Sequence, residues 1–373
     1  MKILFLAPAN SVHTIKWVNA LQKKGNEICL VSLAEHKTIE VLEKGITVRY
    51  LKINGKKGYY ANAFALRKIT EEFAPDVINA HYASGYGTLM RISRLPRNRC
   101  ILSVWGDDVY RFPYESKVTF HIIRKNLSYT SYIASTSYCM KEQVERLIQK
   151  ECKITVTPFG VDTKIFSGKE HSFDDDKFVF GSMKSIEYQY GIDILIKAFA
   201  IFIHNLDKTQ QDRVFLKIYG SGTIEEEMRL LAESLGVGKQ IEFCGYISNK
   251  LVPEALNKID VLCLTSVETE SFGVAAVEAM ACQVPVIVSD VVGYKEVVLH
   301  NRTGLVVPQF NIEATCKAME KLYGDSALRR QFGENGRRWV KEKYEWERCV
   351  QIMMDLYHRV YTGCDGKESD NDY

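Results

Sequence analysis

The sequence predicts an α/β protein built from two doubly wound, Rossmann-like domains, and three observations support that prediction. The chain has 373 residues, more than one hydrophobic core usually organises. Short apolar runs alternate with amphipathic helical stretches from the first residues on, a pattern typical of parallel sheets covered by helices on both faces. The alternation stops at about residues 162–177 and then starts again, as expected of a linker between two similar domains.

The strand candidates of the first half are short and β-rich and show no clean alternation of polar and apolar residues. Strands of this kind are typical of parallel sheets that are buried on both faces. In chain order, the strand and helix candidates read KILFLAP, TIKWVNALQKKG, EICLVSL, DVINAH, GTLMRISRL, CILSVWG, KEQVERLI and ITVTPFG. The first half is therefore predicted to form one doubly wound domain.

The second half repeats the pattern over a similar length. Its candidates read FVFGS, GIDILIKAFAIFI, VFLKIYG, EEEMRLLAESLG, IEFCG, LVPEALNK, VLCLTS, GVAAVEAMAC and VPVIVS, followed by the helical stretches IEATCKAMEKLYG, SALRRQFGENGRRWVKEKY and EWERCVQIMMDLYHRVY. We expect domains at 1–165 and 166–345, a final helix at 346–362 and a disordered polar tail at 363–373. In paired domains of this type, the ligand lies in a central cleft beyond the carboxyl ends of the strands.

The composition indicates a cytoplasmic globular protein. The ten cysteines are scattered singly without a C-x-x-C pair, which argues against a zinc ribbon, a redox motif or a secreted disulfide framework. The start MKILFLAPANSVH is a poor secretory signal because polar residues follow its short apolar run directly. The most apolar helix candidate is interrupted by Asp193 and Lys197 and is too short to span a membrane.

The net charge of +3 is unevenly distributed. Residues 1–165 hold 25 Lys and Arg against 14 Asp and Glu, or +11, and the remainder holds 24 against 32, or −8, which sums to +3. This asymmetry suggests that the first half faces an anionic partner. A solvated basic face without a partner is the alternative.

Two glutamates, Glu270 and Glu278, frame a stretch of small apolar residues. Glu270 falls in the turn between a predicted strand and a predicted helix, and Gly273 stands at the mouth of that helix. A glycine there lets a ligand approach the backbone, and the free N–H groups of a helix start favour an anion such as phosphate. Carboxylates suit vicinal diols, because each oxygen accepts one hydroxyl proton. The alternative is a helix-terminal charge followed by a solvated glutamate.

The region 214–308 resembles the retaining family 4 (group 1) glycosyltransferases of GT-B fold. The family pattern E-x-F-G-x-x-x-x-E, followed by A-M-A-x-x-x-P-V-I, is nearly intact in ETESFGVAAVEAMACQVPVIV. PFGVDTKIF is similar to the family's linker motif, and YEWERCVQIMMDLY is similar to its closing segment, which crosses back to the first domain. The resemblance implies two Rossmann-like domains that face a central cleft.

The resemblance also implies a retaining transfer of a sugar from a nucleotide-sugar donor, which is bound mainly by the second domain. Glu270 would lie at the sugar, Ser271 and the amides of Phe272 and Gly273 near the phosphates, and Glu278 at the ribose. The family has no established protein nucleophile. The leaving phosphate is proposed to help deprotonate the acceptor hydroxyl, so the protein contributes positioning and charge stabilisation.

A developing diphosphate needs cations, and the family supplies an Arg and a Lys from the loop after the first strand of the second domain. The corresponding loop starts near Gly181, a donor-side candidate, and places Lys184 at about the Arg position, where an ordinary exposed lysine is the alternative. Gln189 and Tyr190 stand where the second cation is expected. The family contacts the nucleobase through the backbone of a segment that matches FCGYI, which contains Tyr246. A UDP-sugar is favoured over a GDP-sugar because UDP is the commoner donor of the family.

The first domain departs from the family pattern. The loop APANSVHT lacks the usual glycines, but Ser11 and His13 are candidates for acceptor or sugar contacts. A structural or solvated histidine is the alternative for His13. SVWGDDVY resembles the family's H-G-x-D segment with Trp105 in place of the histidine, which leaves Asp108 as a candidate for a sugar or acceptor hydroxyl. A helix-capping role for Asp108 is the alternative. His81, at another strand end, is expected to be a satisfied core histidine.

No D-x-D pair stands in a plausible metal loop, so the sequence predicts no metal and no cofactor; the nucleotide-sugar is a co-substrate. The acceptor is expected to be a glycan or a lipid-diphosphate-linked sugar of bacterial surface polysaccharide synthesis. Basic and aromatic stretches such as RLPRNR and YESKVTFHIIRKNL suggest contact with an anionic membrane surface, and no nucleic-acid module is present. The alternatives are a nucleotide-sugar epimerase or hydrolase of the same fold, and a catalytically impaired homologue.

Overall fold

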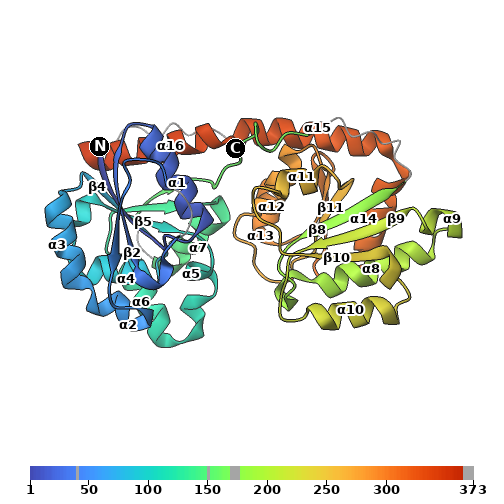
Figure 1. The fold of residues 1–373 in the computed structure, drawn as a ribbon, viewed down its shortest axis with the longest axis horizontal. Coiled ribbons are helices and arrows are strands. Elements are labelled where there is room, and N and C mark those ends of the chain that lie inside the picture. Colours follow the sequence, from blue (N-terminus) through green and yellow to red (C-terminus); the bar gives the residue numbers. More distant parts are fainter. Residues whose placement is uncertain (39–41, 149–151, 169–176, 364–373) are drawn as a thin grey trace. The chain divides into compact units, whose positions relative to one another are not determined.

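The computed structural model describes residues 1–38, 42–148, 152–168 and 177–363, and the chain divides into two compact units. Unit 1 comprises Met1–Phe159 and the chain from Cys349 on, and unit 2 comprises Gly160–Arg348. Each unit has one parallel sheet with helices on both faces (Figure 1). The predicted α/β class with two doubly wound domains is therefore confirmed. Part of the predicted linker and nearly all of the predicted tail lie outside the described residues.

The sheet of unit 1 has seven strands in the order β3-β2-β1-β4-β5-β6-β7, and all neighbours pair in parallel. The strands are β1 Lys2–Leu6, β2 Glu27–Leu33, β3 Thr47–Leu51, β4 Val77–His81, β5 Cys100–Val104, β6 Tyr132–Ser135 and β7 Lys153–Val156. Strands β4 and β5 are buried along their whole length. Helices on both faces account for this burial, and it explains why these strands lack an alternating pattern.

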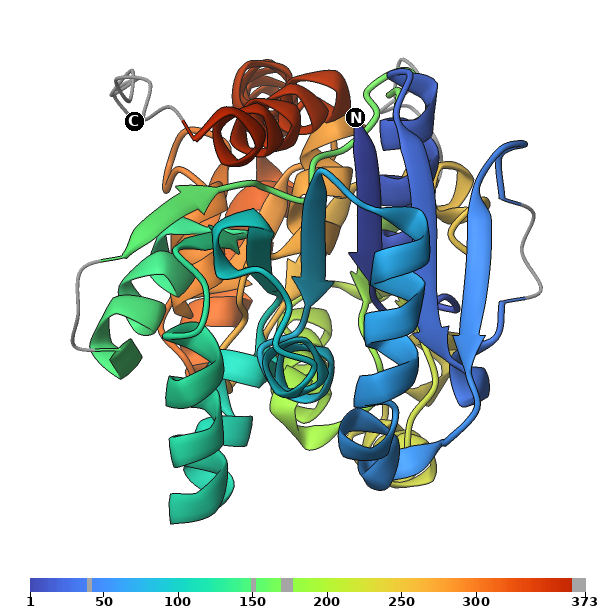
Figure 2. The same ribbon diagram turned by 90° about the vertical axis from the view of Figure 1, so that its left-hand side faces the viewer.

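The helices of unit 1 lie between successive strands, and the last helix of the chain joins them. The helices are α1 Val12–Lys23, α2 Gly55–Ala61, α3 Ala63–Phe73, α4 Gly85–Ile92, α5 Asp107–Tyr110, α6 Lys117–Leu127, α7 Tyr138–Ile148 and α16 Trp346–Thr362. Figure 2 shows α16 in dark red beside the strands of unit 1. The buried hydroxyl of Tyr357 on α16 accepts a hydrogen bond from Asn79 Nδ2 at 2.8 Å, so α16 is bonded directly to the centre of β4.

The sheet of unit 2 has six parallel strands in the order β10-β9-β8-β11-β12-β13. The strands are β8 Phe178–Met183, β9 Val214–Tyr219, β10 Ile241–Gly245, β11 Val261–Leu264, β12 Val286–Ser289 and β13 Gly304–Val307. The helices are α8 Ile192–His204, α9 Lys208–Gln211, α10 Glu225–Ser234, α11 Val252–Leu256, α12 Val274–Ala281, α13 Val292–Val297, α14 Ile312–Gly324 and α15 Ser326–Lys343.

Helix α8, the most apolar helix candidate of the sequence, lies in the core of unit 2. Its side chains Leu195, Phe199 and Phe202 are at most 1% exposed, and they belong to the same core cluster as residues of β8, β9 and α14. Asp193 and Lys197 form an ion pair on the same helix. No helix among the described residues is long and apolar enough to cross a membrane.

Both sheets have a topological switch point, where successive connections leave in opposite directions. In unit 1 the switch lies between β1 and β4, and in unit 2 it lies between β8 and β11. Crevices at the carboxyl ends of such strand pairs are the common ligand sites of open α/β sheets. The loops that follow these four strands are therefore where functional side chains are expected.

Candidate functional site

The switch point of unit 2 brings together the two residues that the sequence predicts to act on the donor. Lys184 directly follows β8, and Glu270 lies in the loop between β11 and α12. The Lys184 Nζ donates a hydrogen bond to Glu270 Oε2, and the two side chains are only 14% and 17% exposed. An ammonium and a carboxylate thus meet in a largely buried position, although 86 positions separate them in the chain.

Tyr294 contacts the Glu270 side of this pair, from α13, the helix that follows β12. Its hydroxyl lies 3.2 Å from Glu270 Oε2 and 3.1 Å from Ser266 Oγ, and its side chain is fully buried. The backbone N–H of Gly293 donates to the Glu270 carbonyl at 3.0 Å. A Cβ on Gly293 would lie 2.3 Å from that carbonyl oxygen, so only glycine lets α13 approach the Glu270 loop this closely.

Aromatic rings surround the charge of Lys184. The Nζ atom lies 5.0 Å from the ring centre of Tyr190 and 5.8 Å from that of Tyr294, within the range of cation–π attraction. Burial by itself lowers the pKa of Lys184, but Tyr294 and the carboxylate of Glu270 more than offset this effect, so the pKa lies above its ordinary value. Burial also raises the pKa of the Tyr294 hydroxyl. At neutral pH the site therefore holds a charged lysine and a neutral tyrosine that can donate a hydrogen bond.

The backbone of the Lys184 loop is held by a glycine turn. Lys184 N–H donates to the Tyr219 carbonyl at 3.2 Å. A Cβ on Gly220 or Gly222 would lie 2.1 Å from the Lys184 oxygen or 2.0 Å from the Ile186 oxygen, respectively. Two backbones in such close contact fix where the lysine side chain starts, and rigid support of this kind limits the entropy lost on binding.

A second contact ties the same loop to the segment that follows β11. The carbonyl of Gln189 accepts hydrogen bonds from Val267 N–H at 2.9 Å and Glu268 N–H at 3.3 Å. Gln189 thus supports the segment that leads to Glu270 through its main chain. Tyr190, which stands where the sequence suggests a second cation, places its ring beside Lys184 instead.

The start of α12 has the local geometry that the sequence predicts. Gly273 is the N-cap residue with φ +92°, and a Cβ there would meet the Tyr294 ring at 2.8 Å. Phe272 is 1% exposed and packs edge-on against Tyr344 with ring centres 5.5 Å apart. Its side chain therefore belongs to the core, which leaves its backbone amide as the group with a predicted ligand role. Ser271, beside it, is partly exposed.

Glu278 lies within α12, five positions after the N-cap glycine, and is partly exposed. Burial, and then the charge of Glu278, raise the pKa of the Cys282 thiol to about 12, which places the carboxylate near that thiol. The helix predicted around Glu278 is confirmed, and its contact with a ribose stays a prediction.

Two further donor-side candidates differ in their surroundings. Gly181 lies inside β8, opposite Lys217 and Leu262, and a Cβ there would lie 2.3 Å from Ile259 Cδ1. Packing against Ile259 is sufficient to explain this glycine. Tyr246 follows β10 and is 78% exposed, so its side chain is open to a ligand.

In unit 1, the loop after β1 leads into an aromatic cluster rather than an open polar site. Ser11 is the N-cap residue of α1, and its side chain makes no capping hydrogen bond. His13 stacks on Phe159 with ring centres 4.2 Å apart and lies 5.7 Å from the ring of Trp105. Burial, followed by the charge of Lys16, lowers the pKa of His13 to about 4. His13 is therefore neutral at physiological pH.

Trp105, at the end of β5, packs edge-on against His81 with ring centres 4.6 Å apart. His81 stacks on Phe5 and is fully buried, as expected for a core histidine. Neither of its ring nitrogens has a hydrogen-bond partner among the described residues, so the expectation that it is satisfied is corrected. Burial lowers the pKa of His81 well below its usual value.

The prediction that Asp108 contacts a sugar or acceptor hydroxyl is corrected, because its carboxylate accepts hydrogen bonds from backbone N–H groups. It accepts hydrogen bonds from the N–H groups of Ala83 at 2.7 Å, Gly106 at 2.9 Å and Trp105 at 3.1 Å. The residue is 2% exposed, and burial raises its pKa despite these bonds. Asp108 therefore stabilises the turn into α5, close to the capping role considered as the alternative, and does not present its carboxylate to a ligand.

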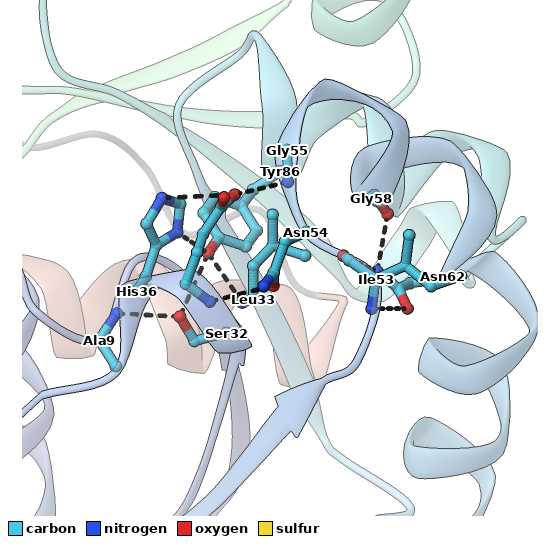
Figure 3. A network of polar contacts seen from close by, with 11 residues as sticks. Ala9, Ser32, Leu33, His36, Ile53, Asn54, Gly55, Gly58, Asn62 and Tyr86 are labelled. Atoms are coloured by element: carbon cyan, nitrogen blue, oxygen red, sulfur yellow. Dashed lines mark hydrogen bonds and ion pairs between the residues drawn. The ribbon is translucent and has the colours of Figure 1, made fainter.

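A polar network that no sequence motif predicts is centred on Tyr86, the second residue of α4 (Figure 3). The Tyr86 hydroxyl lies 2.7 Å from His36 Nδ1 and 3.2 Å from Ser32 Oγ, and it accepts the N–H of Leu33 at 3.1 Å. Ser32 Oγ in turn accepts the N–H of Ala9 at 3.0 Å. These bonds connect the loop after β1, the end of β2 and the start of α4. A lone tyrosine in GYGTLM gives no signal of this role.

Among the described residues, no group of three His, Cys, Asp or Glu side chains is placed to hold a metal ion.

Two protein-family profiles match the chain. The family described as "Glycosyl transferases group 1" matches residues 164–339, and the family described as "Glycosyl transferase 4-like" matches residues 2–137. Together they span most of both units.

Two individual relatives match over part of the chain. An uncharacterized glycosyltransferase of Methanocaldococcus jannaschii is 29% identical over 184 residues, which are 49% of this chain and 45% of that protein. A capsular polysaccharide biosynthesis glycosyltransferase of Staphylococcus aureus is 27% identical over 253 residues, 64% of each chain. The chain thus spans less than two thirds of the length of these two relatives.

Solved structures match over nearly the whole chain. A sucrose-phosphate synthase from Thermosynechococcus elongatus superposes with a TM-score of 0.84 at 18% identity and covers 98% of this chain and 100% of its own. An Anabaena protein in complex with UDP-glucose has a TM-score of 0.75 at 16% identity and covers 96% of this chain and 100% of its own. At these identities the likeness concerns the fold.

Proposed function

Since this chain belongs to the group 1 glycosyltransferases of GT-B fold, we propose that it transfers a hexose or a related sugar from a nucleotide-sugar to a glycan or lipid-linked acceptor, with retention at the anomeric carbon. The observation that carries this proposal is the Lys184–Glu270 pair at the switch point of unit 2. A basic and an acidic group at this place match the two ends of an activated sugar, its phosphates and its hydroxyls.

Each group of the site has a distinct chemical task in this proposal. The Glu270 carboxylate accepts hydrogen bonds from sugar hydroxyls, and the Lys184 ammonium neutralises the charge that develops on the leaving diphosphate. The N–H groups at the start of α12 add partial positive charge on the same side. Tyr294 and Gly293 hold Glu270 in place, so little reorganisation is needed when the donor arrives.

We further propose a UDP-sugar as the donor and a reaction that needs no metal ion. An Anabaena structure of the same fold contains UDP-glucose, which supports the choice of base. The main-chain segment around Tyr246 and the Glu278 carboxylate are assigned to the nucleoside. Lys184 supplies the cation that stabilises the diphosphate.

The acceptor is proposed to be a growing surface polysaccharide or a lipid-diphosphate-linked sugar, used at the cytoplasmic face of a membrane. The Staphylococcus aureus relative of capsular polysaccharide biosynthesis supports the polysaccharide. Positions 1–165 hold 25 basic residues against 14 acidic ones. This surplus of positive charge supports an anionic acceptor or surface.

The decisive experiment incubates the purified protein with UDP- and GDP-sugars and a panel of glycan and lipid-linked acceptors, with analysis of the products by NMR. Transfer in which the donor's anomeric configuration is kept supports the proposal. Glu270→Gln should lower kcat/KM by roughly 100-fold or more, whereas Glu268→Gln, an exposed neighbour in the same loop, should have little effect. Acceptor-independent epimerisation or hydrolysis of the donor, or binding without turnover for every donor and acceptor, would favour the alternatives instead.

A further inference from the structure

Unit 1 contains a basic cavity that the proposed reaction does not use. Its volume is about 740 Å³, and its lining includes Arg91, Arg94, Arg97, Lys125, Ser128 and Tyr129. Arg91 and Lys125 lie in the last turns of α4 and α6. The other lining residues lie between these helices and the strands that follow them, β5 and β6. The cavity therefore lies at the amino ends of the strands, the opposite edge of the sheet from Ser11 and His13.

The four cations of this cavity lack acidic partners. No carboxylate lines it, and within the described part of the chain none of the four forms an ion pair with Asp or Glu. Like charges gathered without counter-charges repel one another. A bound anion would remove that repulsion.

Neutral neighbours fix the direction of two of the arginines. Arg91 Nε donates to Asn126 Oδ1 at 2.6 Å. The fully buried Asn126 amide donates in turn to the Ala83 carbonyl and to Thr88 Oγ1, both at 2.7 Å, so its oxygen must face Arg91. Because this bond uses Nε, the Nη groups of Arg91 can bind a ligand, and no other described residue forms a hydrogen bond with them.

Arg97 is oriented by an aromatic ring. Its guanidinium lies 4.8 Å from the ring centre of Tyr129, whose hydroxyl donates to the Leu95 carbonyl at 2.6 Å. A guanidinium held over a tyrosine ring has several N–H donors and can form two parallel hydrogen bonds to an oxyanion. Its position is thus set before any ligand binds.

Stabilisation of helix dipoles explains only part of this charge. Arg91 lies in the last turn of α4, and Lys125 in the last turn of α6, where cations are favourable. Arg94 and Arg97 lie outside both helices and are exposed, so neither the helices nor the core require them.

We propose that this cavity binds a phosphate group, with guanidinium contacts from Arg91, Arg94 and Arg97 and the ammonium of Lys125 beside them.

The phosphate could be a free diphosphate or the headgroup of an anionic lipid, which present the same oxyanion chemistry. The test compares the wild-type protein with Arg94→Gln/Arg97→Gln. A matched control, Arg111→Gln/Arg146→Gln, removes two exposed arginines of the same unit that pair with Asp107 and Glu142 outside the cavity. All three proteins must give the same thermal unfolding midpoint within about 2 °C, because the replaced side chains are exposed.

Calorimetric titration with inorganic pyrophosphate and co-sedimentation with phosphatidylglycerol vesicles form the two arms. We expect the cavity variant to bind at least tenfold more weakly in one arm or both, and the control to bind like the wild-type protein. Loss in the pyrophosphate arm identifies a free phosphate ligand, and loss in the vesicle arm alone identifies a lipid headgroup. Equal losses in both variants, or no loss in either arm, would overturn the proposal.

The same titration on Lys184→Gln separates this cavity from the donor site. Retained binding by Lys184→Gln, together with loss in the cavity variant, supports the cavity. Loss of all pyrophosphate binding in Lys184→Gln with none in the cavity variant would assign the phosphate to the donor site and refute a pyrophosphate site in unit 1. The lipid arm rests on the anionic surface named in the proposed function, whereas the pyrophosphate arm is independent of it, because binding is measured without any transfer reaction.

Discussion

The ammonium of Lys184 and the carboxylate of Glu270 form a largely buried ion pair that joins the ends of β8 and β11. Removing two charges from water is costly, and their attraction compensates only when the geometry is good and further hydrogen bonds are made. Here Tyr294 supplies such a bond, and two aromatic rings face the ammonium. A pair held in this way at a sheet's switch point suits a binding site better than a stabilising core.

We predict strong energetic coupling between the two charges. Lys184→Met should lower the free energy of unfolding of unit 2 by about 2–4 kcal/mol, because it leaves the Glu270 carboxylate without its counter-charge. Glu270→Gln should cost less, since an amide still accepts from Lys184 and Tyr294. The double variant should be more stable than the sum of the single effects predicts, with a coupling of about 1–3 kcal/mol in urea unfolding. Additive effects would mean that the pair is not formed in solution.

Tyr294→Phe should distinguish the positioning of Glu270 from the binding of the nucleotide. Loss of the hydroxyl removes bonds to Glu270 and Ser266, so we expect a stability loss of about 1 kcal/mol. Transfer should fall more than the affinity for the bare nucleotide, since the proposed partner of Glu270 is the sugar. The matched control is Tyr357→Phe, which removes another buried hydroxyl bond, to Asn79 in unit 1. If the control reduced kcat as much as Tyr294→Phe, the positioning role would be refuted.

The sequence predicts the fold from local patterns, and the family resemblance singles out Lys184 and Glu270 as donor-side candidates. Apolar strand runs predict buried parallel strands, and a parallel sheet brings the residues after neighbouring strands to one edge, as happens with Lys184 and Glu270. The roles of Tyr294 and Tyr86 depend on which loops meet across strands. A tyrosine in a short helix shows the same pattern whether its hydroxyl binds a carboxylate or faces solvent.

Asp108 illustrates the same limit from the other side. A carboxylate after a strand end is equally consistent with a sugar contact and with a turn held by backbone amides. The choice depends on the path of a distant segment, because Ala83 supplies one of the three amides. Local spacing contains no information about that segment.

Gly293→Ala should damage the site through the backbone. The added Cβ would lie 2.3 Å from the Glu270 carbonyl oxygen, so α13 or the Glu270 loop must move. We expect a loss of stability of about 1–3 kcal/mol and a marked fall in transfer activity. Gly324→Ala, at the end of α14 where a Cβ would meet nothing within 4 Å, should be neutral or slightly stabilising. Unfolding in denaturant and initial rates distinguish the two.

The stability of unit 1 should decrease between pH 6.5 and pH 4 because of His13. Burial and Lys16 lower the pKa of this residue to about 4 in the folded chain, so the unfolded chain takes up the proton first as the pH falls, and folding becomes less favourable. The lowering of the His13 pKa from 6.5 to about 4 corresponds to at most about 3.4 kcal/mol. His13→Phe keeps a ring against Phe159 and should flatten this part of the pH profile of stability. A remaining slope is expected from His81, whose pKa is also lowered.

Hydrogen-exchange protection of β1 and β4 at several pH values measures the effect in unit 1 alone. His121→Phe, an exposed position on α6, is the control, and an unchanged slope in His13→Phe would show that the imidazole is not buried in its neutral form.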